Sequence, residues 1–224
     1  MLDAMPDIPG AGVPERFALV AGFGPGVRLL TAAGEVPVER LATGDLLVTR
    51  DGPPAPVLWL GRRTFGQAPS GRAPGLAPVE VAPSALGPGV PSRPTPLAPA
   101  SRVLLGGWRV ELHCGIGEAL ATVADLPGAA RATRNAAARA PRYTYVLLPA
   151  PALVNANGLW VETLVLDGAA LDLFGAALPP EPMARPGLLA GHARAARPCL
   201  AGWEVAALHG ARAGVPADPV RAVA

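Results

Sequence analysis

Short runs of apolar residues recur along most of this chain, and glycine, proline and other turn residues separate them. Runs of this length, rich in valine and leucine, are typical of half-buried or buried strands rather than of long amphipathic helices. Strands are expected at residues 16–21, 27–31, 46–49, 56–61, 76–81, 102–105, 108–112, 143–148, 152–154 and 159–164. Many short strands with frequent turns predict an all-β protein of antiparallel strands.

The connections between these runs carry residues that suit tight turns. Asp51-Gly52 and Asn157-Gly158 are dipeptides of the kind found in two-residue hairpin loops. Gly106-Gly107 separates two apolar runs and predicts a hairpin between residues 102–105 and 108–112. Glu39 and Asp45 are expected to cap or brace turns, as is Asp51.

Helical periodicity is confined to a few places. Leu200, Trp203, Ala207 and Leu208 recur at helical spacing and predict one short C-terminal helix at about residues 198–209. Residues 36–41 fit either one helical turn or an extended bend. The alanine- and arginine-rich stretch 131–140 fits a short helix or a loop.

The composition divides the chain into three parts. Residues 1–16 are expected to form a flexible arm, 17–178 a β domain, and 179–224 a tail that carries the short helix. Within the β domain, residues 66–99 and 127–142 are rich in proline, glycine or alanine and are expected to be loop-rich. A chain of 224 residues is long enough to bury a hydrophobic core.

Charge and composition exclude several classes of function. The formal charge is only +2, and no basic run alternates with aromatic residues, so a nucleic-acid binder is not indicated. All 19 basic residues are arginine, which together with abundant alanine and proline indicates a GC-rich coding bias, as in many bacteria. No run of about 18 apolar residues is present to span a membrane.

The start of the chain lacks a signal-peptide pattern, so a cytoplasmic or non-classically secreted protein is expected. A monomer with an unidentified protein partner is the simplest expectation.

The residue types that usually carry chemistry are scarce. Cys114 and Cys199 are far apart and match no metal-ligand spacing, so no metal or cofactor is expected. His192 and His209 lie in the tail and are expected to face solvent. The four tryptophans are expected to anchor the core; they are Trp59, Trp108, Trp160 and Trp203.

Two blocks of sequence resemble bacterial Hint (hedgehog/intein) domains. Residues 22–65 read GFGPGVRLLTAAGEVPVERLATGDLLVTRDGPPAPVLWLGRRTF, which is similar to the opening of that family. Residues 143–164 read YTYVLLPAPALVNANGLWVETL, which resembles a later family block. The resemblance extends over roughly residues 17–210. It implies a Hint-like all-β fold and a family chemistry in which the domain cleaves its own backbone.

The resemblance also locates the positions where that chemistry belongs. The family's nucleophile, a cysteine or serine, corresponds to Gly22. Its mid-chain Thr/Ser-x-x-His motif corresponds to Ala98 and Ser101, and a later histidine corresponds to Tyr145. The family's Asp-Arg-His-Glu turn corresponds to residues 149–152, which are proline and alanine. The resemblance therefore implies a degenerate site, with Gly22, Ala98 and Ser101 close together in space.

Two other functions stay open. An active autoprocessing domain would need a relocated nucleophile, either Cys114 or Ser101. His113 is a candidate base, although neighbouring residues on a strand point to opposite faces, so it could not activate Cys114 directly. The other alternative is a small-molecule binding or hydrolytic β protein, which would need a cleft with converging polar groups.

Overall fold

The computed structural model describes residues 20–65, 77–126, 141–185, 187–192, 194–209 and 221–222. The expected flexible arm (1–16) and the stretch 131–140 lie outside this part, as do residues 66–76 and 127–140 of the two stretches expected to be loop-rich (66–99 and 127–142). The strands are β1 (Arg28–Thr31), β2 (Gly34–Pro37), β3 (Leu46–Leu47), β4 (Ala55–Pro56), β5 (Trp59–Thr64), β6 (Val79–Val81), β7 (Thr95–Leu97), β8 (Arg102–Gly106), β9 (Glu118–Thr122), β10 (Arg142–Leu147), β11 (Leu153–Ala156), β12 (Leu159–Glu162) and β13 (Arg221–Ala222).

The helices are short and mostly follow the strands in the chain. They are α2 (Trp108–Cys114), α4 (Gly168–Phe174), α5 (Pro180–Met183), α6 (Leu188–Gly191) and α7 (Gly202–His209), with 3-10 turns η1 (Val38–Arg40), η2 (Val123–Asp125) and η3 (Gly175–Ala177). Helix α7 confirms the expected C-terminal helix. Helices α2 and α4 to α6 are further short helices that the sequence pattern did not indicate.

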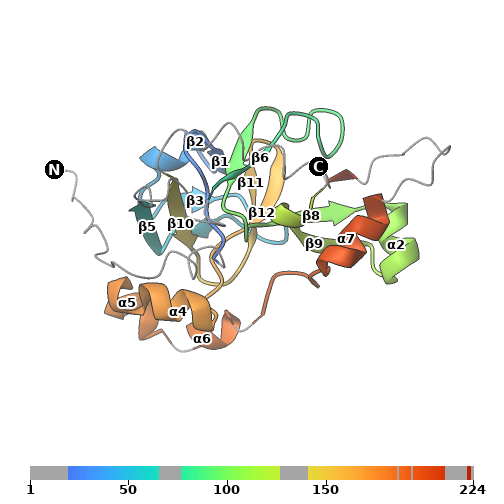
Figure 1. The fold of residues 1–224 in the computed structure, drawn as a ribbon. Coiled ribbons are helices and arrows are strands. Elements are labelled where there is room, and N and C mark those ends of the chain that lie inside the picture. The colour runs from blue at the N-terminus through green and yellow to red at the C-terminus, as the bar shows by residue number, and fades with distance from the viewer. Residues whose placement is uncertain are drawn as a thin grey trace.

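The strands form one large antiparallel sheet and two small antiparallel pairs. The large sheet has the order β13-β8-β12-β11-β1-β3-β4, with β2 paired to β1 and β9 paired to β8. The small pairs are β10-β5 and β6-β7. In Figure 1, α4, α5 and α6 lie together below the end of the fold that carries β5 and β10, while α2 and α7 lie side by side near β8 and β9. The predicted all-β architecture is confirmed.

The expected hairpin at Gly106-Gly107 is wrong. Residues 108–114 form helix α2, which begins after Gly107 (φ 112°) and ends at Gly115 in the left-handed region (φ 68°). The alternation of Trp108, Val110 and Leu112 suggested a strand, but only Val110 is buried. Strand β8 instead pairs with β9, which is rich in buried alanine and leucine.

The core forms two main apolar clusters. One fills the inside of the large sheet and takes in Val205 and Leu208 of α7. The other lies between the β5-β10 pair and helix α4, where the rings of Trp59 and Tyr145 contact Phe174 with centroids 5.5 and 4.7 Å apart. The expectation that Trp59 anchors the core is confirmed.

The other tryptophans behave differently. Trp160 is only half-buried, with the Arg50 guanidinium above its ring. Trp108 and Trp203 are 58% and 74% exposed, so the expectation that they anchor the core is wrong. Both stand on the outer sides of α2 and α7, whose buried sides carry Val110, Val205 and Leu208 instead.

The histidines of the tail also differ from expectation. His192, expected to face solvent, is fully buried. Its Nε2–H donates to the Leu148 carbonyl at 3.0 Å, and burial lowers its pKa while this bond offsets part of the effect. His209 is half-buried, with Nδ1 2.8 Å from the Val205 carbonyl.

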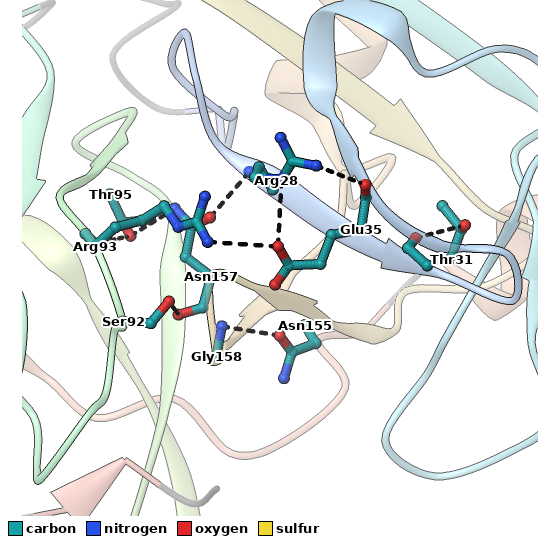
Figure 2. A network of polar contacts seen from close by, with 10 residues as sticks. Arg28, Thr31, Glu35, Ser92, Arg93, Thr95, Asn155, Asn157 and Gly158 are labelled. Atoms are coloured by element: carbon teal, nitrogen blue, oxygen red, sulfur yellow. Dashed lines mark hydrogen bonds and ion pairs between the residues drawn. The ribbon is translucent and has the colours of Figure 1, made fainter.

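The predicted Asn157-Gly158 turn is confirmed, and its asparagine also holds distant segments together. Both residues have positive φ (54° and 88°), as a two-residue hairpin loop requires. The buried Asn157 side chain accepts from the Arg28 N–H at 3.1 Å and donates to Thr95 Oγ1 at 3.0 Å. Figure 2 shows it between β1 and the segment leading to β7, where Ser92 N–H donates to the Asn157 carbonyl at 2.8 Å.

Other expected turn roles are also confirmed. Glu39 accepts the Gly26 N–H at 2.6 Å, and Asp45 accepts the Ala42 N–H at 2.8 Å. Asp51 instead forms an ion pair with a residue distant in the chain: its Oδ1 lies 2.5 Å from Nη2 of Arg197 in the tail.

Candidate functional site

Gly22 and Ser101 meet in the interior although they lie 79 positions apart in the chain. The Gly22 N–H donates to Ser101 Oγ at 3.0 Å, and the Ser101 hydroxyl donates to the Gly22 carbonyl at 3.0 Å. The Ala98 N–H also donates to that carbonyl, at 2.8 Å. The predicted convergence of Gly22, Ala98 and Ser101 is confirmed.

Pairing on both sides of Gly22 fixes the local backbone. Phe23 exchanges two hydrogen bonds with Thr144 of β10, at 2.9 and 2.8 Å. The Gly24 N–H donates to the Pro96 carbonyl of β7 at 2.8 Å. A Cβ on Gly24 would lie only 2.7 Å from that carbonyl oxygen, so this close approach requires glycine. Together these bonds hold the Gly22 peptide between β7 and β10.

Tyr145 occupies the space that a side chain on Gly22 would need. A Cβ on Gly22 would lie 3.0 Å from Tyr145 Cε1 and 3.3 Å from Tyr143 Cβ, which is tighter than ordinary contact. The Tyr145 side chain is fully buried, and its hydroxyl makes no hydrogen bond in the described part of the chain. Burial raises the pKa of this hydroxyl well above its usual range, and the Arg63 charge offsets part of that rise. Tyr145 is therefore neutral and acts by filling space.

The geometry of Ser101 suits bonding better than attack. A serine hydroxyl has one proton, and here that proton is directed at the Gly22 carbonyl. The same oxygen accepts the Gly22 N–H, and that N–H lies in the plane of the Ala21-Gly22 peptide. Ser101 Oγ therefore lies near that plane. A nucleophile must approach a carbonyl from above that plane, with a base to remove its proton. Within the described residues, no histidine or carboxylate hydrogen-bonds to Ser101.

Cys114 and His113 lie on α2, so the expectation that they occupy a strand is wrong. Cys114 is half-buried, and burial, with a smaller contribution from Glu204, raises the pKa of its thiol. Since the thiolate is the reactive form, this environment disfavours nucleophilic chemistry. His113 is exposed. In the described part of the chain, neither side chain hydrogen-bonds to Gly22 or Ser101.

A cleft of about 370 Å³ opens beside the Gly22–Ser101 pair. Its lining comes from three separate segments and from β9; the residues are Val20, Ala21, Pro99, Ala100, Arg102, Thr122, Ala124, Leu164, Val165 and Asp167. Ala21, which would precede the family's nucleophile, forms part of the wall. The cleft was not expected from the sequence, because its residues are scattered over about 150 positions and are mostly small or apolar.

Arg102, at the cleft wall, pairs with a buried carboxylate. Its Nε lies 2.7 Å from Oε2 of Glu162, which is fully buried, although the N–H does not point along a hydrogen-bond direction. The other oxygen, Oε1, accepts the Ala196 N–H at 2.5 Å. Burial raises the pKa of Glu162, while Arg102 and Ala196 lower it. A glutamate within an apolar run is a sequence signal for a buried carboxylate, but it does not identify the partner.

The described residues contain no group of three or more His, Cys, Asp or Glu side chains arranged to hold a metal ion. None of their helices has the length and apolar character needed to cross a membrane.

Comparison with known proteins identifies a matching family. A family model described as a Hint domain matches residues 21–168, from Ala21 at the cleft to the first residue of α4. No curated protein and no solved structure matches the chain.

Proposed function

Because the chain belongs to the Hint domain family, we propose that it keeps the family fold as a protein-interaction module that has lost self-cleavage. The observation that carries this proposal is the bonding of Gly22. Both its N–H and its carbonyl are held by one serine hydroxyl, and a tyrosine ring fills the space where the nucleophile would stand.

The family chemistry, as the sequence resemblance implies, needs three groups at this place. A side chain on residue 22 must attack the Ala21 carbonyl, a donor must stabilise the oxyanion, and an acid must protonate the nitrogen of residue 22 as the amide bond breaks. Gly22 supplies no nucleophile, and Ala98 supplies no hydroxyl. Ser101 is a poor general acid near neutral pH, and Tyr145 is a neutral phenol.

Intact-mass spectrometry of the purified full-length chain tests the loss of cleavage. We expect a single mass after prolonged incubation, with or without added thiol or hydroxylamine, because no ester or thioester forms. A pair of fragments that corresponds to a break between Ala21 and Gly22 would overturn the proposal. Size-exclusion chromatography of the same sample checks the expected monomer.

Restoring the missing groups provides a positive comparison. Gly22→Cys alone should stay intact, since it lacks an acid and its side chain would crowd the Tyr145 ring. Gly22→Cys combined with Ala98→Ser, Ser101→His and Tyr145→His supplies all the groups and replaces the phenol ring with a smaller imidazole. We expect slow, thiol-sensitive cleavage at Ala21-Gly22 from this combination only.

An active domain that uses Ser101 is the second candidate, because Ser101 Oγ lies 3.0 Å from the Gly22 nitrogen. This function would give an ester at Ser101 and fragments released by hydroxylamine. The Ser101→Ala variant separates the two candidates: any fragments seen with the natural chain should disappear in this variant if Ser101 is the nucleophile.

A further inference from the structure

The cleft beside Ala21 has main-chain groups that lack hydrogen-bond partners in the part of the chain that the structure describes. Val165 and Leu166 are buried, at 8% and 4% exposure, and Ala21 is half-buried. Within the described residues, neither the N–H nor the carbonyl of any of these three makes a hydrogen bond. Backbone groups in such places are normally paired, because leaving them unpaired costs free energy. Ala21 and Val165 line the cleft, and Leu166 follows in the same wall segment.

The unpaired groups come from two places in the chain, Ala21 and residues 165–166. A ligand that lies between them must offer both donors and acceptors. An extended polypeptide does so, because its N–H and carbonyl groups alternate on its two edges. The cleft volume, about 370 Å³, is near the lower end of the usual range of about 300–1,000 Å³ for ligand sites. Only a few residues with small side chains would fit.

The charges at the cleft indicate one further property of the occupant. The Arg102 charge is balanced by Glu162, at 2.7 Å. Asp167 is exposed and uses Oδ1 to accept the Ala170 N–H at 2.9 Å, which leaves Oδ2 without a partner among the described residues. Arg102 is thus engaged by Glu162, whereas the Asp167 carboxylate at the cleft wall favours a basic residue on the occupant.

We propose that this cleft binds an extended segment of a partner protein, with small apolar residues beside a basic one. The inference rests on the proposed loss of self-cleavage, because only an intact chain keeps Ala21 in the wall. The loss of self-cleavage and the binding of a peptide can be contradicted separately. A chain that gives a single mass but binds no peptide would agree with the loss of self-cleavage and would overturn the inference about the cleft.

The test is a titration of the ¹⁵N-labelled full-length chain with a blocked peptide, acetyl-Ala-Val-Ala-Arg-amide, followed by NMR. Two matched peptides accompany it, one with N-methylated inner amides and one with glutamate in place of arginine. We expect saturable shifts of the Ala21, Val165 and Leu166 amide signals with the first peptide. N-methylation should abolish them, and glutamate should weaken them.

A pair of variants isolates the charge. Asp167→Asn removes the charge but keeps the helix cap, since asparagine caps helices as well as aspartate does. We expect this variant to bind the arginine peptide about three- to tenfold more weakly, and to bind the glutamate peptide with unchanged or slightly higher affinity. Asp45→Asn is the control, because Asp45 also accepts a main-chain N–H but lies outside the cleft lining.

Three results would each overturn the inference. The first is the absence of shifts at these amides with millimolar peptide. The second is equal binding of the N-methylated peptide, which would indicate adventitious apolar contact. The third is the same affinity in Asp167→Asn and Asp45→Asn. Concentration-dependent shifts of the same amides without peptide would mean that a second copy of this chain occupies the cleft, and would also count against it.

Discussion

Replacing Ser101 with alanine would test whether the Gly22–Ser101 bonds hold the fold together at this point. The substitution removes a buried hydroxyl that serves two bonds of 3.0 Å. The Gly22 carbonyl keeps its bond to the Ala98 N–H, but the Gly22 N–H loses its acceptor. Since Gly22 is buried, that donor can reach no solvent.

The size of the effect follows from that single orphaned donor. A buried donor left without an acceptor costs about 1–3 kcal/mol. For a chain of this size, 1 kcal/mol shifts the melting temperature by about 2–4 °C, so we expect a decrease of about 2–12 °C. Urea denaturation followed by circular dichroism gives the free energy directly, and an unchanged m-value would show that the unfolded state is not altered.

Ser84→Ala is the matched control for this measurement. Ser84 Oγ also accepts a glycine N–H, from Gly89 at 3.1 Å, but that bond is exposed. Water can replace the lost acceptor there, so we expect a change within about 0.5 kcal/mol. Equal losses of stability in the two variants would refute the reasoning, because burial of the Gly22 donor would then contribute nothing.

Three further outcomes are expected. Tyr145→Phe should raise the free energy of unfolding by about 1 kcal/mol in urea denaturation, because the buried hydroxyl has no hydrogen-bond partner among the described residues; a loss of stability would reveal a partner. Asn157→Ala should lower it by about 2–4 kcal/mol, since the Arg28 N–H and Thr95 lose buried partners; a change below about 0.5 kcal/mol would contradict this. Burial lowers the folded-state pKa of His192, so its stability contribution is present above about pH 6.5 and is lost as the pH falls below that value. His192→Gln should flatten the decline in stability between about pH 7 and 5, and an unchanged decline would contradict this reasoning.

The strands and turns were predictable because their causes are local. Asn157-Gly158 forms its turn through the backbone preferences of those two residues, whatever surrounds them. The convergence of Gly22 and Ser101 was predictable for a different reason, since it came from the sequence resemblance. No local property of either residue indicates the other, 79 positions away.

The failures share a physical origin in tertiary packing. The pattern from Trp108 to Leu112 alternates as in a strand, but burial of Val110 alone against the sheet is compatible with a helix. His192 looked like a surface residue in a polar tail, yet α6 places it against Leu148. The pair Arg102–Glu162 depends on two strands lying side by side, β8 and β12, which periodicity cannot indicate.

The bond between Asn157 and Arg28 spans 129 positions, and this separation sets an order of events during synthesis. Until β11 and β12 have left the ribosome, β1 can pair only with β2 and β3, and Phe23 lacks its partner Thr144. The bonds of Gly22 to Ala98 and Ser101 can form once residues 98–101 are made. Closure on the β10 side has to wait for Thr144, so the strand that carries the Ala21-Gly22 peptide can be paired on both sides only after the first two thirds of the chain have been made.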